Sequence, residues 1–503
     1  MSPRLAAPVI DAPFPRRSGK VDRERHHKLR QLRLQGREPF PDVHLPSRSP
    51  AAAVLAAHDP RLLDPGEHRT WRYVVAGRLI ARRKHRHAVF LDLRDQSGVI
   101  ELCVKRDRLD DVRCAPLLSA DIGDIVAAEG HIYVTDNHKL TLAILASRLL
   151  TKALRSPPAR TNGAAGTAPK YRQRELDLLA NERTQLLFEA RSSVTATLRE
   201  YMAQGSFIEV EGPPAQPLPI EAPPAPVDPG GNGREISLRA SARTHLRRCL
   251  LGGLERVYEL GKHARDDRAS QRHAPELTML DWSAAYIDYK EAARQAEEVI
   301  RYAAAACTPE MQALWHGHAI DLRGPWQATT VQQTILELCG IDIFAADAAA
   351  LARQLPSGAH AGEDSWGELV NEIYTTLVQP TLIQPTVVHD HPLIDRSLVK
   401  RHPVHDQLAC SFHVVIGGCE VAAGESELND PYEHWERLTA QAKSSPVRNG
   451  AMSAYRDREV RLLEYGLCPA ASARLQVDRL IMLLTGSDTV HDVVPFPLAG
   501  APA

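Results

Sequence analysis

The sequence ERVYELGKHARDDRASQRHAPELTMLDWSAAYIDY, residues 255–289, decides the fold of this protein. Its first part is a short apolar run that Gly261 ends, and its second part places Leu277, Met279, Asp281 and Ser283 on one face by a period of two. Arginines, histidines and carboxylates fill the residues between the two runs. The stretch therefore predicts two strands joined by a charged loop. Such a loop suits a polyphosphate, because guanidinium groups pair phosphate oxygens bidentately, although charge alone favours a solvated loop.

The same stretch resembles motif 2 of the class II aminoacyl-tRNA synthetases, and that of the lysyl-tRNA synthetases in particular. The segments that carry the resemblance are ERVYEL at 255–260, ARDD at 264–267 and RHAPELT at 272–278. Matches in the same order extend over roughly residues 23–500. The resemblance implies an α+β fold, with an N-terminal OB-fold β-barrel and a class II catalytic domain built on an antiparallel sheet flanked by helices. Because several motif residues are replaced, it also implies a divergent paralogue of the bacterial type.

Composition restricts the class of protein. The 503 residues predict about two to four domains, and a formal net charge of −1 means that any nucleic-acid contact must come from local patches. Eight cysteines without a Cys-x-x-Cys pair argue against a zinc site or a disulfide framework and fit a reducing cytoplasm. No run reaches the ~18 apolar residues of a membrane span. We therefore expect a cytoplasmic protein without membrane segments.

Shifts in composition predict four regions. Residues 1–70 form a basic N-terminal arm and helix, 71–155 an OB-fold domain like an anticodon-binding domain, 156–169 a Pro/Ala/Gly linker, and 170–503 a synthetase-like catalytic domain. Within the last region, the alanine-rich segment 300–378 is expected to be a helical insertion. The N-terminal arm is rich in lysine and arginine, which suits either contact with tRNA phosphates or a solvated tail.

Five short apolar runs predict a small Greek-key barrel, an architecture that often binds nucleic acid. By resemblance to the anticodon-binding domain of lysyl-tRNA synthetases, Arg83 and Phe90 occupy positions that hold and stack anticodon bases. Glu101 stands where that family has glutamine, and Lys139 where it has glutamate. Both are base-edge positions, so the substitutions predict altered anticodon reading. For Phe90, a place in the barrel core is the alternative.

The resemblance implies ATP and Mg²⁺ as cofactors. It gives Arg265 the catalytic role, which is to neutralise charge at the α-phosphate together with magnesium. Arg479 matches the arginine that pairs the γ-phosphate. The matching ATP positions are Arg265, Asp267, His273, Glu276, Glu420 and Arg479. The three glycines of motif 3 are replaced by Ser472, Arg474 and Gln476, whose side chains predict an altered nucleotide pocket.

Gly417 and Gly418, between two apolar runs, predict a two-residue hairpin turn. With that turn Val415 faces Glu420, so His413 and Glu420 are diagonal neighbours on one face. The family has carboxylates at the positions of both His413 and Glu420 and uses them to hold the magnesium of ATP. Because magnesium prefers hard oxygen ligands, the histidine predicts a weakened metal site.

Three positions match amino-acid-binding residues of the family. Glu427 matches the residue that binds the side chain of lysine, and Asp281 replaces a glutamate. Arg243 falls on the glutamate that binds the substrate ammonium. At ~4 Å and an effective dielectric constant near 20, one charge pair is worth about 4 kcal/mol. Arg243 therefore predicts that ordinary lysine binding is lost unless the pocket is remodelled.

These substitutions leave three functions open. The family reaction is ATP-dependent activation of lysine and its transfer to tRNA(Lys), which we expect to be impaired or altered here. The alternatives are an adenylate-forming enzyme for another acid or acceptor, whose carboxylate Arg243 would pair, and a non-catalytic RNA-binding or regulatory dimer. A nucleotide cavity closed by Arg474 and Gln476 would favour the dimer.

The expected partners are tRNA or other RNA and a second copy of the chain. The helix and strand predicted over 189–213 resemble motif 1, which forms the dimer interface of the class II synthetases. A helix–strand pair buried within one subunit would give the same pattern.

Overall fold

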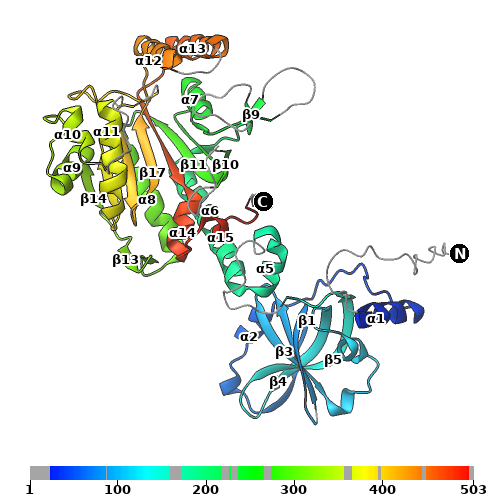
Figure 1. Ribbon diagram of the computed structural model, residues 1–503. Coiled ribbons are helices and arrows are strands. Elements are labelled where there is room, and N and C mark those ends of the chain that lie inside the picture. Colours follow the sequence, from blue (N-terminus) through cyan, green and yellow to red (C-terminus); the bar gives the residue numbers. More distant parts are fainter. Residues whose placement is uncertain are drawn as a thin grey trace. The chain divides into compact units, whose positions relative to one another are not determined.

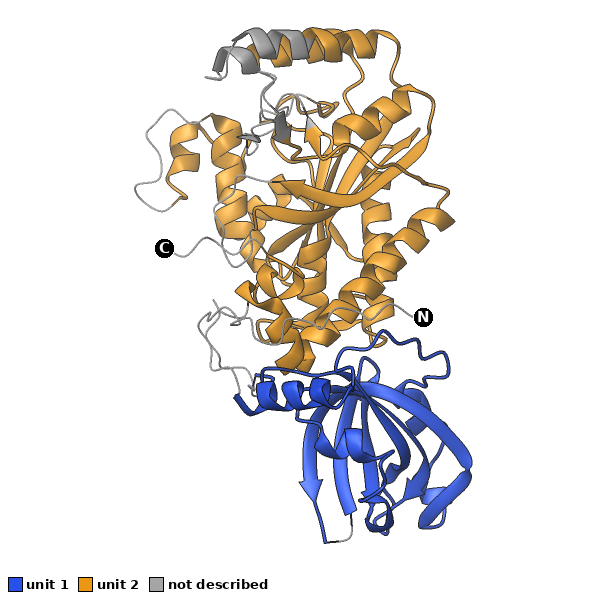
Figure 2. Ribbon diagram, turned by 90° about the vertical axis from the view of Figure 1, so that its right-hand side faces the viewer, with its two compact units in different colours: residues 1–160 blue, residues 161–503 orange. Residues whose placement is uncertain are grey.

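The computed structural model describes residues 23–86, 88–158, 171–216, 226–227, 236–264, 274–355, 365–394, 398–444 and 449–497. The chain divides into two compact units, residues 1–160 and 161–503, which Figure 2 shows in separate colours. Within the described residues, the structure holds no helix that is both long enough and apolar enough to span a membrane.

The first unit is a closed five-stranded barrel with the strand order β1-β2-β3-β5-β4 (Figure 1). All five strands expected from the sequence are present, so the predicted barrel is confirmed. The strands are β1 Gly66–Lys84, β2 Ala88–Asp95, β3 Gly98–Lys105, β4 Ile125–Val134 and β5 Leu140–Thr151. The helices are α1 Arg23–Leu34, α2 Ala51–Ala56, η1 Pro60–Leu62, η2 Arg106–Arg108 and α3 Ala115–Ser119.

Alternating apolar side chains fill the barrel, because successive residues of a strand point to opposite faces. Leu79, Leu91 and Leu102 have no exposed surface. Two glycines let the strands approach closely. A Cβ on Gly77 would lie 2.2 Å from the carbonyl oxygen of Arg94, and a Cβ on Gly130 would lie 2.3 Å from that of Ala143. Both obstacles are backbone atoms, so a side chain at either position would force the barrel open.

The second unit is built on an eight-stranded sheet with the order β14-β15-β16-β17-β18-β11-β10-β6. Only the outermost pairs, β14 with β15 and β6 with β10, are parallel. The strands are β6 Ile208–Glu209, β10 Arg256–Ala264, β11 Glu276–Ala285, β14 Gln327–Thr330, β15 Thr386–His389, β16 Ser411–Ile416, β17 Cys419–Ser426 and β18 Ala470–Gln476. The predicted antiparallel sheet is therefore confirmed.

Two hairpins of this sheet match the sequence patterns that predicted them. The stretch 255–289 forms β10 and β11, with Glu259 directly opposite Asp281. Gly417 and Gly418 have φ angles of +60° and +72° and join β16 to β17. Such φ angles suit glycine, which has no Cβ to clash with the backbone.

Helices flank the sheet of the second unit. Helix α8, Tyr289–Cys307, begins where Asp288 accepts hydrogen bonds from the amides of Lys290 and Glu291, and it packs on β16, β17 and β18. The long helix predicted from residue 189 begins earlier, as α6, Glu182–Gln204. The remaining helices are α5 Arg174–Ala180, α7 Arg243–Leu251, α9 Val331–Cys339, α10 Ala348–Ala352, α11 Trp366–Ile373, η3 Tyr374–Val378, η4 Gln379–Thr381, α12 Pro431–Ser444, α13 Asn449–Glu464, α14 Val477–Thr485 and α15 Val490–Val493.

The segment 300–378 corrects one expectation. It was expected to be helical, but it also holds the hairpin β12, Gln312–Trp315, and β13, His318–Asp321, and the edge strand β14. Alanine content favours helix, whereas β14 gains backbone hydrogen bonds from β15 that sequence periodicity does not show. Figure 1 shows α9 to α11 gathered near β14. Three further short strands, β7 Ala215–Gln216, β8 Pro226–Val227 and β9 Ile236–Leu238, form a separate small sheet.

Candidate functional site

One face of the large sheet carries the polar side chains of the candidate site. Residues that lie directly opposite each other in an antiparallel sheet point to the same face. The pairings His413 with Ala423, Ala423 with Arg474, Arg474 with Asp281, and Asp281 with Glu259 therefore form a row across five strands. The adjacent row contains Ser411, Glu425, Ser472, Ser283 and Val257. The other face is apolar, since Trp282, Phe412, Val414 and Leu475 lie in the core beside α8.

Arg243, the first residue of α7, is bound within this site. Its Nε donates to Glu427 Oε1 at 2.9 Å and its NH2 donates to Glu427 Oε2 at 3.0 Å. Its NH1 donates to Glu425, and NH2 also donates to the carbonyl oxygen of Leu398 at 3.1 Å. The side chain of Arg243 is only 13% exposed. The guanidinium is therefore fixed in place by groups of the protein itself.

Glu427 is completely buried and receives further partners from the neighbouring strand. The hydroxyl of Ser472 donates to Glu427 Oε1 at 2.5 Å, and Ser472 and Ser283 share a hydrogen bond of 2.6 Å. Arg247 Nε lies 3.6 Å from Glu427 Oε2. Burial by itself would raise the pKa of Glu427, but the charges of Arg243 and Arg247 and the hydrogen bonds from Arg243 and Ser472 hold this pKa below its ordinary value.

The predicted amino-acid positions come together around a very small cavity. Arg243 and Asp281 line it, together with Ser283, Glu425 and Arg474, and its volume is about 20 Å³. A cavity of that size has room for about one water molecule. Asp281 Oδ2 lies 3.3 Å from Nε2 of His263, which is buried on β10. Ion pairs within the chain therefore fill most of the space around Glu427.

A second buried ion pair lies beside this cavity. Glu259 accepts hydrogen bonds from both terminal nitrogens of Arg239 and, at 3.2 Å, from the amide of Gly212. Arg239, Glu259 and His263 were not among the residues predicted for the site. Glu259 lies in the segment ERVYEL that carries the resemblance to motif 2, and its period on β10 places it opposite Asp281.

The predicted metal position has one imidazole, of His413, and one carboxylate, of Glu420. Val415 lies opposite Glu420 as predicted, and His413 Nδ1 is 3.3 Å from Glu420 Oε2. Gln476 donates to Glu420 Oε1 at 3.1 Å, and Arg479 donates to the backbone carbonyl of Glu420 at 2.9 Å. Among the described residues, no group of three or more His, Cys, Asp or Glu side chains could hold a metal ion. An imidazole and a single carboxylate do not fit the oxygen ligation that Mg²⁺ requires.

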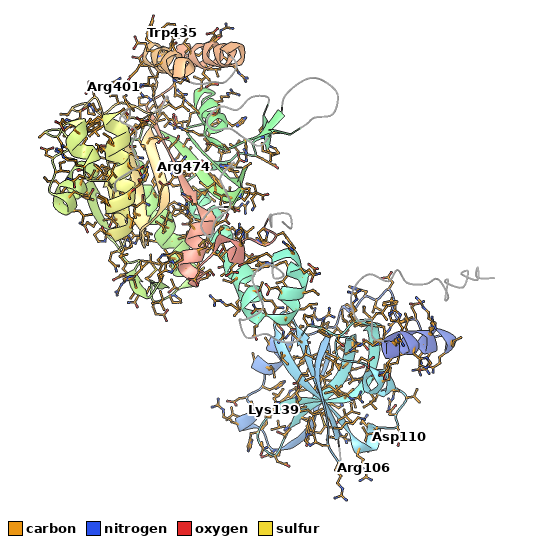
Figure 3. All side chains as sticks on the ribbon, in the orientation of Figure 1. Arg106, Asp110, Lys139, Arg401, Trp435 and Arg474 are labelled. Carbon is orange, nitrogen blue, oxygen red and sulfur yellow. The ribbon has the colours of Figure 1, made fainter. Side chains whose placement is uncertain are left out.

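The predicted nucleotide positions are only partly described. Arg265, Asp267 and His273 lie outside the described residues. Glu276 begins β11 and pairs with Lys262 at 3.0 Å, where both side chains are nearly half exposed. The motif 3 replacements have different environments. Ser472 hydrogen-bonds Glu427, Gln476 is buried against Glu420, and Arg474, labelled in Figure 3, is exposed.

Asp478, at the start of α14, is held by two partners on other elements. Its Oδ1 accepts from Arg191 of α6 at 2.6 Å, and its Oδ2 accepts from the amide of Thr278 at 2.7 Å. Asp478 therefore ties α14 to α6 and β11.

Three of the four predicted RNA positions of the barrel, Arg83, Glu101 and Lys139, form one cluster. Glu101, whose side chain is 8% exposed, accepts from Arg83 at 2.6 Å, from Lys139 at 2.8 Å and from Thr141 at 3.1 Å. Arg83 also forms a bidentate pair with Asp92, at 2.9 and 2.7 Å. The two residues that replace base-edge groups, Glu101 and Lys139, therefore bind each other. Figure 3 labels Lys139 on the barrel.

Phe90 lies outside the apolar core of the barrel. Its ring is half buried and meets His85 edge-on, with 5.5 Å between ring centroids. Phe90 lines an open groove of about 1040 Å³ together with Lys105, Arg106 and Tyr133. A half-buried aromatic ring that lines an open groove among cations can stack an unpaired nucleic-acid base.

Comparisons with known proteins agree with this architecture. The family described as tRNA synthetases class II (D, K and N) matches residues 167–500, and the OB-fold nucleic acid binding domain matches residues 73–149. A lysine–tRNA ligase of Carboxydothermus hydrogenoformans is 32% identical over 94% of this chain and 96% of its own length. Those of Latilactobacillus sakei subsp. sakei and Bacillus subtilis are 33% and 31% identical, each over 94% of this chain and over 94% and 96% of their own lengths.

These matches show that the chain belongs to the class II tRNA synthetases of the D, K and N group. The three relatives named above are lysine–tRNA ligases, and the predicted resemblance is thereby confirmed.

Proposed function

We propose that this chain is a lysyl-tRNA synthetase-like protein that binds tRNA or other RNA through its barrel and does not activate lysine. The observation that carries the proposal is the ion pair of Arg243 with Glu427, which occupies the position matched to the lysine side-chain site. In the proposal the guanidinium replaces the ammonium of a substrate. About 20 Å³ of cavity remains beside it, far less than a lysine needs.

Energetics support the loss of lysine binding. For lysine to reach Glu427, Arg243 would have to leave a carboxylate that is completely buried. Separating one partner from a buried ion pair costs about 3–5 kcal/mol, because the remaining charge is left without a partner. That cost would be subtracted from the binding energy of the substrate. It corresponds to a loss in affinity of about two to three and a half powers of ten, at about 1.4 kcal/mol for each.

The ATP side of the site also departs from the family. The family reaction uses ATP and Mg²⁺, and His413 stands at one of its two metal carboxylates. Each carboxylate oxygen of Glu420 already has a neighbour, His413 Nδ1 at 3.3 Å and Gln476 Nε2 at 3.1 Å. These contacts support the proposal that magnesium–ATP binding is lost or weak.

The barrel supports RNA binding. Phe90 and the cations of its groove suit a base and its phosphate, whereas the Glu101–Lys139 pair removes two groups that would read base edges. In this proposal residues 71–155 are the RNA-binding module, 1–70 a basic arm, 156–169 a linker and 170–503 a substituted catalytic domain. The proposal also includes a cytoplasmic homodimer, because residues 189–213 resemble motif 1.

The adenylation of another acid is less well supported. It requires Arg243 to pair a substrate carboxylate, but its guanidinium already contacts Glu425 and Glu427. An ATP–pyrophosphate exchange assay distinguishes three functions, which are RNA binding without amino-acid activation, adenylation of another acid, and lysylation.

The experiment measures ATP–pyrophosphate exchange with lysine and with each of the other amino acids, beside a tRNA-binding assay. We expect no exchange with any amino acid and saturable tRNA binding. The lysine–tRNA ligase of Bacillus subtilis serves as the positive control for exchange. Exchange that depends on lysine would overturn the proposal, and exchange with a different acid would replace it with the adenylation function.

A further inference from the structure

A cavity in the first unit is lined by none of the residues predicted to bind nucleotide, amino acid, metal or RNA. It has a volume of about 540 Å³, within the range of about 300–1,000 Å³ typical of ligand sites. Its walls come from α1, the segment that follows α1, α3 and the last strand of the barrel, β5. It shares no residue with the groove of Phe90.

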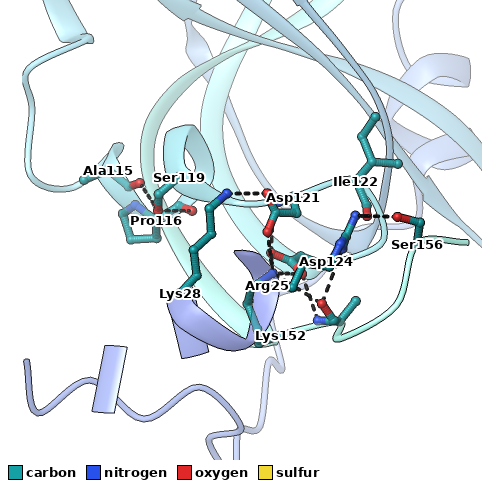
Figure 4. A network of polar contacts seen from close by, with 11 residues as sticks. Arg25, Lys28, Ala115, Pro116, Ser119, Asp121, Ile122, Asp124, Lys152 and Ser156 are labelled. Carbon is teal, nitrogen blue, oxygen red and sulfur yellow. Dashed lines mark hydrogen bonds and ion pairs between the residues drawn. The ribbon is translucent and has the colours of Figure 1, made fainter. Parts of the chain in front are cut away.

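Buried polar contacts hold α1 in place and keep this cavity open. Arg25, 6% exposed, donates to the carbonyl oxygens of Ile122 at 2.8 Å and Ala153 at 3.3 Å. Lys152, whose side chain is 2% exposed, pairs with Asp121 at 2.8 Å and Asp124 at 2.9 Å, and Lys28 of α1 also pairs with Asp121 (Figure 4). Leu29 is the one fully buried apolar residue of α1. The network, rather than apolar packing, therefore fixes the helix against the barrel.

The lining combines an apolar wall with exposed arginines. Leu32, Pro116 and Leu149 supply apolar surface. Arg37 and Arg148 line the same cavity, and both are exposed to solvent. Neither guanidinium group has a hydrogen-bond or ion-pair partner within the part of the chain that the structure describes. Their guanidinium groups therefore remain available to a ligand.

We propose that this cavity receives one unpaired nucleotide of a bound RNA strand. The base lies against Leu32, Pro116 and Leu149, and its phosphates pair with Arg37 and Arg148. Proteins recognise RNA mainly through unpaired bases that are splayed out of the strand, and arginine forks match phosphate oxygens. Arg30 and Arg33, on the last turns of α1, extend the positive surface for the neighbouring phosphates. The inference depends on RNA binding by the chain, but it does not depend on loss of lysine activation.

The test measures binding of fluorescently labelled tRNA to the full chain at several salt concentrations. Arg37→Ala and Arg148→Ala each remove one phosphate contact, so each should lower the slope of log K against log salt by about one. Ala115→Phe adds no charge and fills the cavity, so it should weaken binding by about tenfold through loss of one base contact. Arg69→Ala, an exposed arginine of β1 outside the cavity, is the matched control and should change neither quantity.

Each result has a distinct meaning. If the wild-type chain does not bind tRNA, both this inference and the proposed function fail. If Phe90→Ala weakens binding while the three cavity variants bind like wild type, only this inference fails. A titration with free uridine monophosphate tests whether the ligand is a nucleotide within an RNA strand or a free nucleotide. Saturable binding of the free nucleotide that Ala115→Phe abolishes, without an effect on tRNA, would overturn the assignment to RNA.

Discussion

Arg243 Nε and NH2 bind the two carboxylate oxygens of Glu427, at 2.9 and 3.0 Å, although the residues are 184 positions apart. Arginine presents two parallel N–H groups that match a carboxylate, and lysine cannot reproduce this geometry. In the proposed function, the chain thereby supplies the cation that a substrate would otherwise bring to Glu427. In that proposal, Arg243 fills the site as well as changing its charge.

Replacing Glu427 should destabilise the second unit strongly. In Glu427→Gln, Arg243 and Arg247 lose their buried counter-charge, and we expect the free energy of unfolding to fall by about 3–5 kcal/mol. Urea denaturation measures this change. Glu464→Gln, at an exposed glutamate of α13, is the control and should alter it by less than about 0.5 kcal/mol. Equal stability of the two variants would show that the pair contributes little.

The same glutamate should contribute to acid unfolding. The pKa of Glu427 lies below its ordinary value of 4.5, so its contribution to stability is complete above pH 4.5 and is lost as the pH falls through the lowered pKa. Glu427→Gln has no such group. The difference in unfolding free energy between wild type and variant should therefore shrink from about pH 6 to about pH 3. A difference that stays constant with pH would contradict the assignment of charge to Glu427.

Removing Arg243 should create a lysine site. In Arg243→Ala, Glu427 and Glu425 lose the guanidinium between them, and a lysine ammonium replaces its charge. Lysine should then stabilise the variant, by about 2.7 kcal/mol at a concentration 100 times its Kd, and leave wild type unchanged. Thermal unfolding with increasing lysine measures this, and norleucine, which lacks the side-chain ammonium, is the control ligand. Stabilisation of wild type by lysine would disprove the proposal that Arg243 occupies the lysine site.

His413→Asp should restore magnesium binding beside Glu420. The variant places a second carboxylate next to the first, which supplies the oxygen ligands that Mg²⁺ requires. Titration calorimetry should detect Mg²⁺ binding in His413→Asp and none in wild type. His318→Asp, at an exposed histidine of β13, controls for the added charge. If His318→Asp binds Mg²⁺ as well, the gain does not come from the site.

The two partners of the Glu101–Lys139 pair should differ in their effect on stability. Lys139 is 58% exposed, so Lys139→Ala should cost at most about 1 kcal/mol. Glu101 is nearly buried and also holds Arg83 and Thr141, so Glu101→Ala should cost more than Lys139→Ala. Urea denaturation of both variants tests this order, and the reverse order would contradict the arrangement of the cluster.

Much of the fold was determined by local sequence. The period of two in 277–283 and the glycine pair at 417 and 418 predicted the two central hairpins, and both are present. This succeeds because strand alternation and positive-φ turns are local properties of the chain. The register of the second hairpin then placed His413 beside Glu420, as expected.

Tertiary structure alone decided how the polar residues satisfy one another. The sequence identified Arg243, Glu101 and Lys139 as separate substitutions and Glu427 as a matching position, but it did not show that these residues form two pairs. Nor did it show the strands within 300–378 or the cavity beside α1. The physical reason is that these contacts join residues far apart in the chain. Their energies depend on distance and burial, which only the folded chain fixes.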